Sequence, residues 1–427
     1  MTGKPIKTHL QQRRGKRLQS DAILLPHTLN CPECGLHIQI PALKQGSRAI
    51  CPRCRHELVR VENNPYHMPP ALATTTLILL LCVYSNMFIT VSLAGINETL
   101  SMPSMVKGLI QYDFGFLAEV MFLFTFGSPL IFLILCLYVY IAIIARKPLP
   151  FLLNTTRTML RLREWIMIDV FFISTLVAYI KLSAVARVEF GAAFWLMAVM
   201  ALILVRTIQS VPQHWVYSQI RQLCPDPAPS NEPTICCSRC LHYSPAAESQ
   251  CRICGSHLFE RRPKSLQYSA AFLIAAAILY LPANILPIMI SSNPLNTEIN
   301  TIMNGIAYMW NDGDKVIASI IFSASIMVPT LKILSLAFLQ FSARYGLPMP
   351  VEKMSLLYRI TETVGRWSMI DIFVIIILMS AFHTPVARVT PGPAAVYFCC
   401  VVLLTMLSAH YFDPRLLWDK KLRNTED

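Results

Sequence analysis

Charged residues are scarce in this sequence. Asp, Glu, Lys and Arg make up 14% of its 427 residues, whereas soluble domains carry about 25%. Hydrophobic residues reach 54%, and several apolar runs approach about 20 residues, the length that crosses a hydrocarbon core of roughly 30 Å. The composition excludes an ordinary soluble protein and indicates a polytopic α-helical membrane protein.

Motifs of nucleotide-dependent and hydrolytic enzymes are missing as well. Gly3-Lys4-Pro5 lacks the upstream glycine and the Ser/Thr of a Walker A loop, and the chain has no HExxH, GxSxG or dinucleotide fingerprint. We therefore expect no enzyme, and active transport would draw on a proton gradient or on a partner. The first apolar run follows residue 70, too deep for a signal peptide, so we expect no cleaved leader.

The basic surplus is unevenly distributed along the chain. Eight membrane spans are predicted, near 71–93, 115–145, 164–186, 190–210, 268–292, 314–342, 366–384 and 393–412. The odd-numbered loops and their edges hold only Lys107, Arg187, Lys315 and Arg388 of the basic residues outside the spans. Because Lys and Arg gather in cytoplasmic loops, both termini are predicted to face the cytoplasm. The net charge of +13 then favours anionic lipid headgroups over nucleic acid as its partner.

A four-cysteine motif occurs once before each apolar half of the chain. The first copy consists of Cys31, Cys34, Cys51 and Cys54, and the second of Cys237, Cys240, Cys251 and Cys254. Paired CxxC turns gather four thiolates into the tetrahedron that suits Zn²⁺. With every position filled by cysteine, no ligand position is open for catalysis, so two structural Zn²⁺ ions in zinc ribbons are predicted.

Other interpretations of the cysteines stay open at this point. An iron–sulfur centre also uses four thiolates, and a thioredoxin-like motif uses one CxxC, although neither pair here opens a helix in a βαβ unit. Cys236 stands beside Cys237, so either could be the ligand of the second ribbon. Four nearby histidines are expected to be surface residues of small domains: His37, His56, His242 and His257.

The two apolar halves align with each other. Trp165-Ile-Met-Ile-Asp169 corresponds to Trp367-Ser-Met-Ile-Asp371, Pro129 to Pro329, and Asn86 to Asn284. Each half has an even number of spans, so the repeats run parallel and imply a pseudo-twofold axis along the membrane normal. Pro282, Pro287 and Pro329 are expected to kink spans five and six.

Ionisable residues inside the spans point to function. A charge in hydrocarbon costs from about 2.5 to over 10 kcal/mol, so it normally faces protein or water. A lipid or proton pathway is therefore predicted to involve the following residues: Lys332, Lys181, Asp169, Asp371, His383, Pro329 and Asn284. Simpler readings remain for some of them. Asp169 and Asp371 could pair with Arg163 or Arg366, while Lys181 and His383 could snorkel to the interface.

Four stretches in the second half carry a family resemblance. They are Leu281-Pro-Ala-Asn-Ile-Leu-Pro-Ile288, Met327-Val-Pro-Thr-Leu-Lys332, Gly365-Arg-Trp-Ser-Met-Ile-Asp371 and Phe412-Asp-Pro-Arg-Leu-Leu-Trp-Asp419. With them, nearly the whole chain resembles the paraquat-inducible protein A family of bacterial inner-membrane proteins. The resemblance places a polar intramembrane network on Lys332 and Lys181. The first half has Phe132 where Lys332 would fall, so the main site is expected in the second half.

The resemblance implies two parallel repeats, each a small cytoplasmic zinc ribbon followed by about four transmembrane helices. The expected divisions are a basic tail (1–27), ribbon 1 (28–62), membrane module 1 (70–212), ribbon 2 (232–262), membrane module 2 (266–413) and a cytoplasmic tail (414–427). The implied role is lipid transport between two membranes. The implied partner is a periplasmic tunnel of mammalian-cell-entry domains.

Two rival functions remain at the level of sequence. One is a proton-coupled exporter that acts alone in the inner membrane. The other is a zinc- or redox-sensing membrane scaffold in which the ribbons are the working part.

Overall fold

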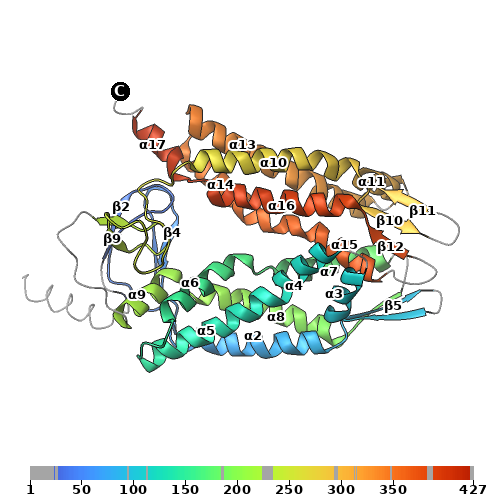
Figure 1. Ribbon diagram of the computed structural model, residues 1–427, viewed down its shortest axis with the longest axis horizontal. Coiled ribbons are helices and arrows are strands. Elements are labelled where there is room, and N and C mark those ends of the chain that lie inside the picture. Colours follow the sequence, from blue (N-terminus) through green and yellow to red (C-terminus); the bar gives the residue numbers. More distant parts are fainter. Residues whose placement is uncertain are drawn as a thin grey trace, which may run out of the picture. The chain divides into compact units, whose positions relative to one another are not determined.

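Helices dominate the structure, which is a computed structural model (Figure 1). It describes residues 24, 27–93, 96–111, 114–183, 187–223, 234–292, 297–311, 313, 315–346, 349–381 and 388–423. The chain divides into two units, and each is described by itself. Unit 1 comprises Met1–Ala73, Leu135–Arg161 and Arg206–Pro263, and unit 2 comprises Thr74–Ile134, Leu162–Val205 and Lys264–Asp427.

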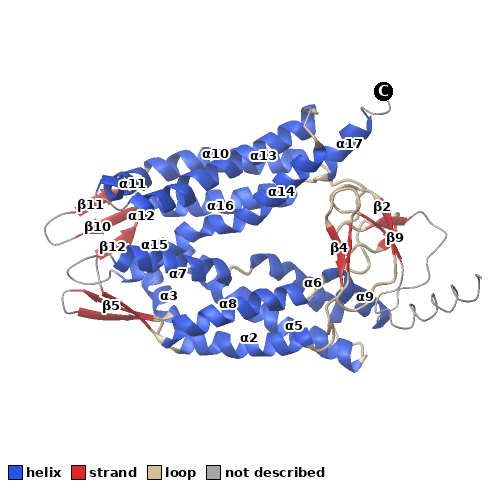
Figure 2. Cartoon of the chain, turned by 180° about the vertical axis from the view of Figure 1, so that it is seen from behind, coloured by secondary structure: helices blue, strands red, loops and turns tan. Residues whose placement is uncertain are grey.

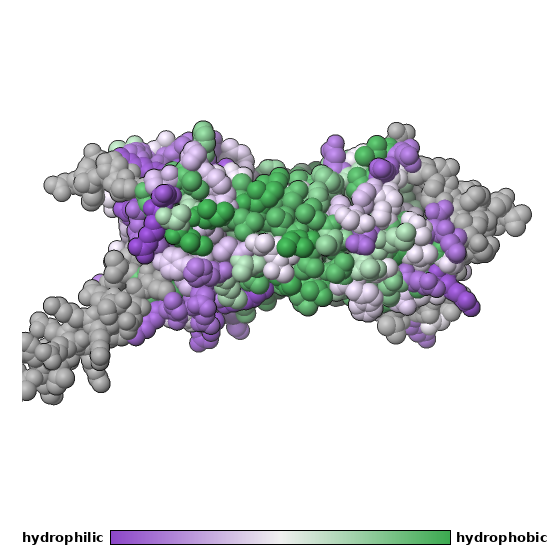
Figure 3. Space-filling model, turned by 90° about the horizontal axis from the view of Figure 1, so that it is seen from below, coloured by the Kyte–Doolittle hydropathy of each residue, from purple (hydrophilic) through white to green (hydrophobic). Residues whose placement is uncertain are grey.

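Six helical segments in the described part of the chain are long and apolar enough to cross a membrane. They are α2 (Met68–Ser85), the run Gly115–Ala145, α8 (Ala192–Ser210), α10 (Ser265–Ile285), the run Ser325–Tyr345 and α16 (Pro393–Tyr411). At 1.5 Å per residue the shortest is about 27 Å long, close to the thickness of a hydrocarbon core. Figure 3 shows hydrophobic side chains gathered in a band between two hydrophilic regions. The predicted fold class, a polytopic helical membrane protein with two repeats, is confirmed.

The third membrane helix of each repeat is shorter than predicted. The helix α7 covers Ile168–Ser183, and α15 covers Ile370–Ala381. The predicted starts at 164 and 366 are wrong, because 3₁₀ turns occupy η2 (Arg163–Trp165) and η4 (Arg366–Met369). Each turn carries a tryptophan shortly before the apolar helix, and the sequence pattern does not distinguish a 3₁₀ turn from the first turn of an α-helix. The polar-faced helices α6 (Leu152–Leu162) and α14 (Val351–Gly365) precede them.

Strands follow the first membrane helix of each repeat. In repeat 1, β5 (Ile89–Leu93) lies between β6 (Ile96–Leu100) and β7 (Arg187–Phe190). In repeat 2, β10 (Met289–Ser292) lies between β11 (Thr297–Asn300) and β12 (Arg388–Pro391), and all pairs are antiparallel. Figure 2 shows these strands at one end of the helices. The predicted ends of spans one and five, at 93 and 292, are therefore wrong: the first and fifth spans stop at Ser85 and Ile285.

Short helices complete each repeat. After the hairpins β5–β6 and β10–β11 come α3 (Met102–Gln111) and α11 (Ile302–Asn311), which lead into the second membrane helices. After the fourth membrane helices come α9 (Gln213–Leu223) and α17 (Arg415–Arg423). The same order of elements thus occurs twice, as the parallel repeat predicts.

The second membrane helix of each repeat contains a π-helical turn. In repeat 1, η1 (Leu123–Gly127) lies between α4 (Gly115–Phe122) and α5 (Ser128–Ala145). In repeat 2, η3 (Ser323–Met327) lies between α12 (Lys315–Phe322) and α13 (Val328–Tyr345). Each π turn ends two residues before a proline, Pro129 or Pro329, which has no N–H for the regular ladder. The predicted break in span six is thus a π turn, a feature that often marks functional sites.

The two repeats meet at their third membrane helices within unit 2. The rings of Phe171 in α7 and Phe373 in α15 lie 5.3 Å apart in an edge-to-face arrangement. These phenylalanines occupy equivalent positions, each two residues after Asp169 or Asp371. A contact between equivalent residues is what a pseudo-twofold axis requires.

Two equivalent glycines allow the fourth membrane helix to start against the end of the first. The N–H of Gly191 donates to Phe88 O (2.9 Å), and that of Gly392 donates to Ile288 O (2.8 Å). A Cβ added at Gly191 would lie 2.2 Å from Met87 O, and one at Gly392 would lie 1.9 Å from Pro287 O. Only glycine fits this close approach of two backbones.

We predict that Gly191→Ala and Gly392→Ala each lower stability by about 1–3 kcal/mol, the usual cost of forcing an extra methyl group into a packed site. Thermal unfolding of the detergent-purified chain measures the effect. Gly108→Ala is the control, because a Cβ there meets nothing within 4 Å and alanine favours the helix α3. Equal melting temperatures for all three variants would contradict the prediction.

Candidate functional site

The structure brings the eight cysteines of the two motifs together in two groups within unit 1. The Sγ atoms of Cys31, Cys34, Cys51 and Cys54 all lie within 4.8 Å of one another, as do those of Cys237, Cys240, Cys251 and Cys254. All eight side chains are buried. The strands β1 (His27–Asn30), β2 (His37–Ile40), β3 (Arg48–Ile50) and β4 (Glu57–Arg60) frame the first group, and β8 (Thr234–Cys236) and β9 (Tyr243–Pro245) frame the second.

The spacing of the thiols suits a tetrahedral metal ion. Sγ–Sγ distances are 3.5 Å for Cys31–Cys54 and 3.6 Å for Cys34–Cys51. The second group shows 3.5 Å for Cys237–Cys254 and 3.6 Å for Cys240–Cys251. A tetrahedron of thiolates around Zn²⁺, with Zn–S of about 2.3 Å, has edges of about 3.8 Å. These cysteines are free rather than joined in disulfides, so each group can hold one metal ion.

Every CxxC turn closes in the same way. The residue after the second cysteine has positive φ: Gly35 (71°), Arg55 (59°), Leu241 (59°) and Gly255 (65°). Its N–H donates to the carbonyl of the first cysteine at 2.8–3.0 Å. Two glycines tolerate this conformation freely, whereas Arg55 and Leu241 adopt it at a cost. All four turns therefore adopt the conformation that gathers the thiols, even at Arg55 and Leu241, where a side chain disfavours positive φ.

Hydrogen bonding among the thiols favours a thiolate in each group. The bond with Cys31 lowers the pKa of Cys34, and the bond with Cys240 lowers the pKa of Cys237. Metal ions bind cysteine as the thiolate. The same bonds raise the pKa of the partner thiols, Cys31 and Cys240.

Cys236 lies outside the second thiol group. Its Sγ accepts a hydrogen bond from the backbone N–H of Asn30 in the first ribbon, at 3.5 Å. Tyr243 of the second ribbon also donates to Asn30 Oδ1, at 3.3 Å. The adjacent cysteine therefore joins the two ribbons, and Cys237 supplies the fourth thiol of its group.

His242 is not the surface residue that the sequence suggested. Its side chain is buried, and its Nδ1 lies 2.8 Å from the carbonyl oxygen of Cys240. Its ring stacks on His214 of α9, with centroids 4.6 Å apart. The sequence carried no sign of this contact, because His214 lies outside both cysteine motifs.

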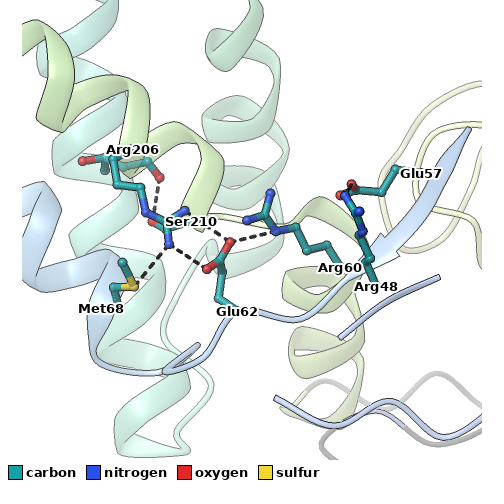
Figure 4. Close-up of polar contacts among 8 residues, drawn as sticks. Arg48, Glu57, Arg60, Glu62, Met68, Arg206 and Ser210 are labelled. Carbon is teal, nitrogen blue, oxygen red and sulfur yellow. Dashed lines mark hydrogen bonds and ion pairs between the residues drawn. The ribbon is translucent and has the colours of Figure 1, made fainter. Parts of the chain in front are cut away.

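A buried carboxylate links the first ribbon to the first membrane module. Glu62 follows β4 and is 4% exposed in its side chain. It accepts hydrogen bonds from Arg206 Nη2 of α8 (2.8 Å) and Arg60 Nε (2.9 Å). Figure 4 shows the two guanidinium groups on either side of it. Such charge-assisted pairs are the strong ones, so the ribbon is fixed to the end of α8 and not merely tethered by the chain.

The predicted membrane site centres on Lys332 of α13. This lysine is 4% exposed, and its Nζ donates to the carbonyl oxygen of Gly365 at 3.4 Å. Gly365 is the last residue of α14 and is followed directly by the 3₁₀ turn η4. Lys332 therefore faces the protein interior and not lipid. In repeat 1 its place is taken by Phe132, which is fully buried.

The structure describes the side chains of only some of the other predicted pathway residues. Pro329 is buried one turn before Lys332, and Asp169 in α7 is half-buried. His383 and the side chains of Lys181, Asp371 and Arg366 lie outside the described residues.

Asn284 acts locally on its own helix. Its Nδ2 donates to Tyr280 O at 2.8 Å, and the equivalent Asn86 donates to Cys82 O at 2.8 Å. Both asparagines thus satisfy a carbonyl at the end of the first membrane helix. The repeated asparagine therefore makes the same backbone contact in both repeats.

Comparison with known proteins finds bacterial relatives of this sequence. The family model described as paraquat-inducible protein A matches residues 67–221 and 266–421. The intermembrane transport protein PqiA of Escherichia coli (strain K12) is 33% identical over 402 residues, which cover 92% of this chain and 95% of the relative.

More distant relatives show the same coverage. The lipophilic envelope-spanning tunnel protein A of the same strain is 28% identical over 391 residues, covering 91% of this chain and 90% of the relative. A probable intermembrane transport protein of Haemophilus influenzae is 26% identical over 402 residues, covering 91% of this chain and 95% of the relative. No solved structure matches the chain significantly.

The geometry predicts different effects for the two adjacent cysteines. Cys237→Ser should remove one bound metal ion per chain, since it deletes a thiol of the second group. Cys236→Ser should keep the full metal content, because its thiol bonds to Asn30 instead. Elemental analysis of the purified chain measures both. Loss of metal from Cys236→Ser alone would reverse the assignment of the ligand.

Proposed function

This chain belongs to the paraquat-inducible protein A family, and on that premise we propose that it moves lipid between the two membranes of a bacterial envelope. Its relatives are named intermembrane transport proteins and an envelope-spanning tunnel protein. The observation that carries the proposal is Lys332, a lysine that is 4% exposed inside a membrane-spanning helix. Such a residue is costly and is a functional-site hypothesis by default.

Lys332 stands beside two features that suit a binding step. It lies one turn after the π turn η3 and Pro329, where the regular helical ladder is interrupted. Its ammonium meets a backbone carbonyl at the end of α14. In our proposal this ammonium holds an anionic lipid headgroup or relays a proton. Its carbonyl partner carries no full charge that would have to be displaced.

The remaining pathway residues are assigned supporting roles. Asp169, Asp371, Lys181 and His383 would tune the charge around Lys332, and Pro329 would shape the helix beside it. The difference between the two repeats supports a single main site in repeat 2, because repeat 1 has Phe132 at the position of Lys332.

We assign Zn²⁺ to both thiol groups. Four buried thiols at 3.5–3.6 Å along the closest edges match an all-cysteine structural zinc site better than a site that keeps an open position for chemistry. The residues that would hold the ions are the eight cysteines of the two groups. Bound zinc would stabilise the ribbons, because the folding of small metal domains is coupled to their metal.

The location and partner complete the proposal. The concentration of Lys and Arg on one side favours an inner-membrane protein with termini and ribbons in the cytoplasm. A periplasmic tunnel of mammalian-cell-entry domains would then receive or deliver the lipid on the periplasmic side of the membrane.

We predict that Lys332→Met abolishes transport while leaving the protein folded or more stable. Methionine keeps the length of the side chain and removes the charge, whose burial costs several kcal/mol. Lys353→Met in α14 is the matched control, since Lys353 is exposed. Resistance of a deletion strain to envelope-disrupting detergents, restored by each variant, measures function. Thermal unfolding measures stability.

A photocrosslinking experiment tests lipid binding directly. In the test variant, a photoreactive residue replaces Ser335, which is half-buried and lies one turn from Lys332. In the control variant, it replaces Leu334, whose side chain is 59% exposed. Lipid captured at 335 should fall at least tenfold with Lys332→Met, whereas capture at 334 reports surrounding lipid and should not change. The proposed site would be refuted if Lys332→Met transported normally, or if the amount of lipid captured at position 335 were the same with and without this substitution.

A further inference from the structure

The second ribbon is held by two helices of the first repeat, one for each of its CxxC turns. At the first turn, Gln213 Nε2 of α9 donates to Arg239 O at 2.8 Å. His214 Nδ1 of α9 lies 2.9 Å from Cys240 O. Because a carbonyl oxygen only accepts, the His214 ring carries its proton on Nδ1. All these residues lie in unit 1.

At the second turn, Arg157 of α6 binds two successive carbonyls. Its Nε donates to Ile253 O at 3.2 Å and its Nη2 donates to Arg252 O at 3.0 Å. Nη1 donates to Asn154 Oδ1 at 3.1 Å, which holds the guanidinium in place from its own helix. The planar fork of arginine suits this arrangement better than the single ammonium of lysine.

Gly255 makes room for the guanidinium. It follows Cys254 with φ of +65°, and a Cβ there would lie 2.8 Å from Arg157 Cζ. In the first turn of the same ribbon, the corresponding residue is Leu241, which also has positive φ. The glycine thus serves both the turn and the close approach of Arg157.

The carbonyl oxygen of Cys240 also accepts a hydrogen bond from a second histidine. His242 Nδ1 lies 2.8 Å from the same oxygen, and its ring stacks on His214. Both rings are buried, at 6% and 9% exposure. A thiol ligand whose own carbonyl is fixed by two donors has little freedom to turn away from a metal ion.

The first ribbon is treated differently. The carbonyls that Arg157, Gln213 and His214 contact all belong to the second ribbon. Its neighbouring ion pair, His56 Nδ1 with Glu33 Oε1 at 2.8 Å, comes from within the ribbon. The two metal sites are therefore built alike at the thiols and unlike around them.

We propose that Arg157 and His214 belong to the second metal site as its outer hydrogen-bonding shell, so that metal retention by the second ribbon depends on the first repeat. The inference rests on the proposed zinc in both thiol groups. Donors that orient metal ligands typically change metal affinity by about 10–100-fold. By linkage, metal that binds more tightly when α6 and α9 are docked also holds those helices more firmly.

Zinc release from the detergent-purified full chain tests this dependence. A chromophoric chelator in excess records the two zinc equivalents as two phases, and Cys251→Ser, which lacks the second site, identifies the phase that belongs to it. Arg157→Ala and His214→Ala should accelerate that phase about 10–100-fold and leave the other phase unchanged. Arg157→Lys, which can reach only one carbonyl, should fall between the wild type and Arg157→Ala.

Arg161→Ala is the matched control. Arg161 lies one turn further along α6, is exposed, and should release zinc like the wild type. Unchanged release from both test variants would overturn the proposal, because the contacts would then be packing alone. Equal acceleration of both phases would also overturn it, since it would report general destabilisation. A wild-type chain without two zinc ions would refute the zinc assignment itself, and this inference with it.

Discussion

Hydrocarbon offers no hydrogen bonds, so every polar group that this chain places in its membrane helices must find a partner in the protein. The helices meet this demand locally at their π turns, whereas the buried hydroxyls of Ser128 and Tyr140 in α5 have no hydrogen-bond partner among the described residues. Thr125 donates to Met121 O at 2.8 Å beside the first π turn, and Thr330 donates to Ile326 O beside the second. Tyrosines from the first membrane helices reach the same places, since Tyr84 and Tyr280 bond to these hydroxyls at 3.0 and 2.9 Å. The ladder can therefore be interrupted in both repeats without leaving bare backbone.

That shared scaffold explains how one repeat can carry a charge that the other lacks. Phe132 and Lys332 occupy equivalent positions after equivalent π turns, and both are almost fully buried. The phenylalanine needs no partner. The lysine needs an acceptor, and the carbonyl of Gly365 at the junction of α14 and η4 provides it. A Cβ at Gly365 would lie 3.0 Å from Nζ, so the glycine keeps the approach open. The two repeats therefore share one frame, and Lys332 gives the second repeat a buried amine that the first lacks.

Much of the fold could be predicted from sequence, because its signals are local. Long apolar runs set the number and order of the helices, and CxxC spacing identified the thiol groups. The errors share one physical cause. Ile89-Thr-Val-Ser-Leu93 and Met289-Ile-Ser-Ser292 continue the apolar runs, but they pair as strands through hydrogen bonds to distant segments. Hydropathy records transfer to hydrocarbon and says nothing of such pairing. Hydropathy also does not distinguish a 3₁₀ turn from an α-helix, so it does not predict the turns at Trp165 and Trp367.

The site could be predicted only in part. Lys332 was evident because a lysine is so rare in a membrane helix, but its acceptor is a backbone carbonyl, which no residue type reveals. Asn284 drew attention through its repetition, whereas its amide serves Tyr280 O on its own helix. Nothing in the sequence pattern indicates that Arg157 and His214 contact the second ribbon. Each contacts the second ribbon from positions far upstream, through carbonyls whose identity the sequence does not encode.

These carbonyl contacts also bear on how the two repeats depend on each other. In the covalent order, the second ribbon opens repeat 2, yet Arg157, Gln213 and His214 of repeat 1 donate to its backbone. A chain cut between the repeats would leave these donors without their acceptors, and each buried donor left unsatisfied costs about 1–3 kcal/mol. The same cut would remove the thiol of Cys236 that accepts from Asn30 in the first ribbon. The sequence repeat is therefore not a structural module: the first half is completed by the beginning of the second, and this exchange ties the two copies into one protein.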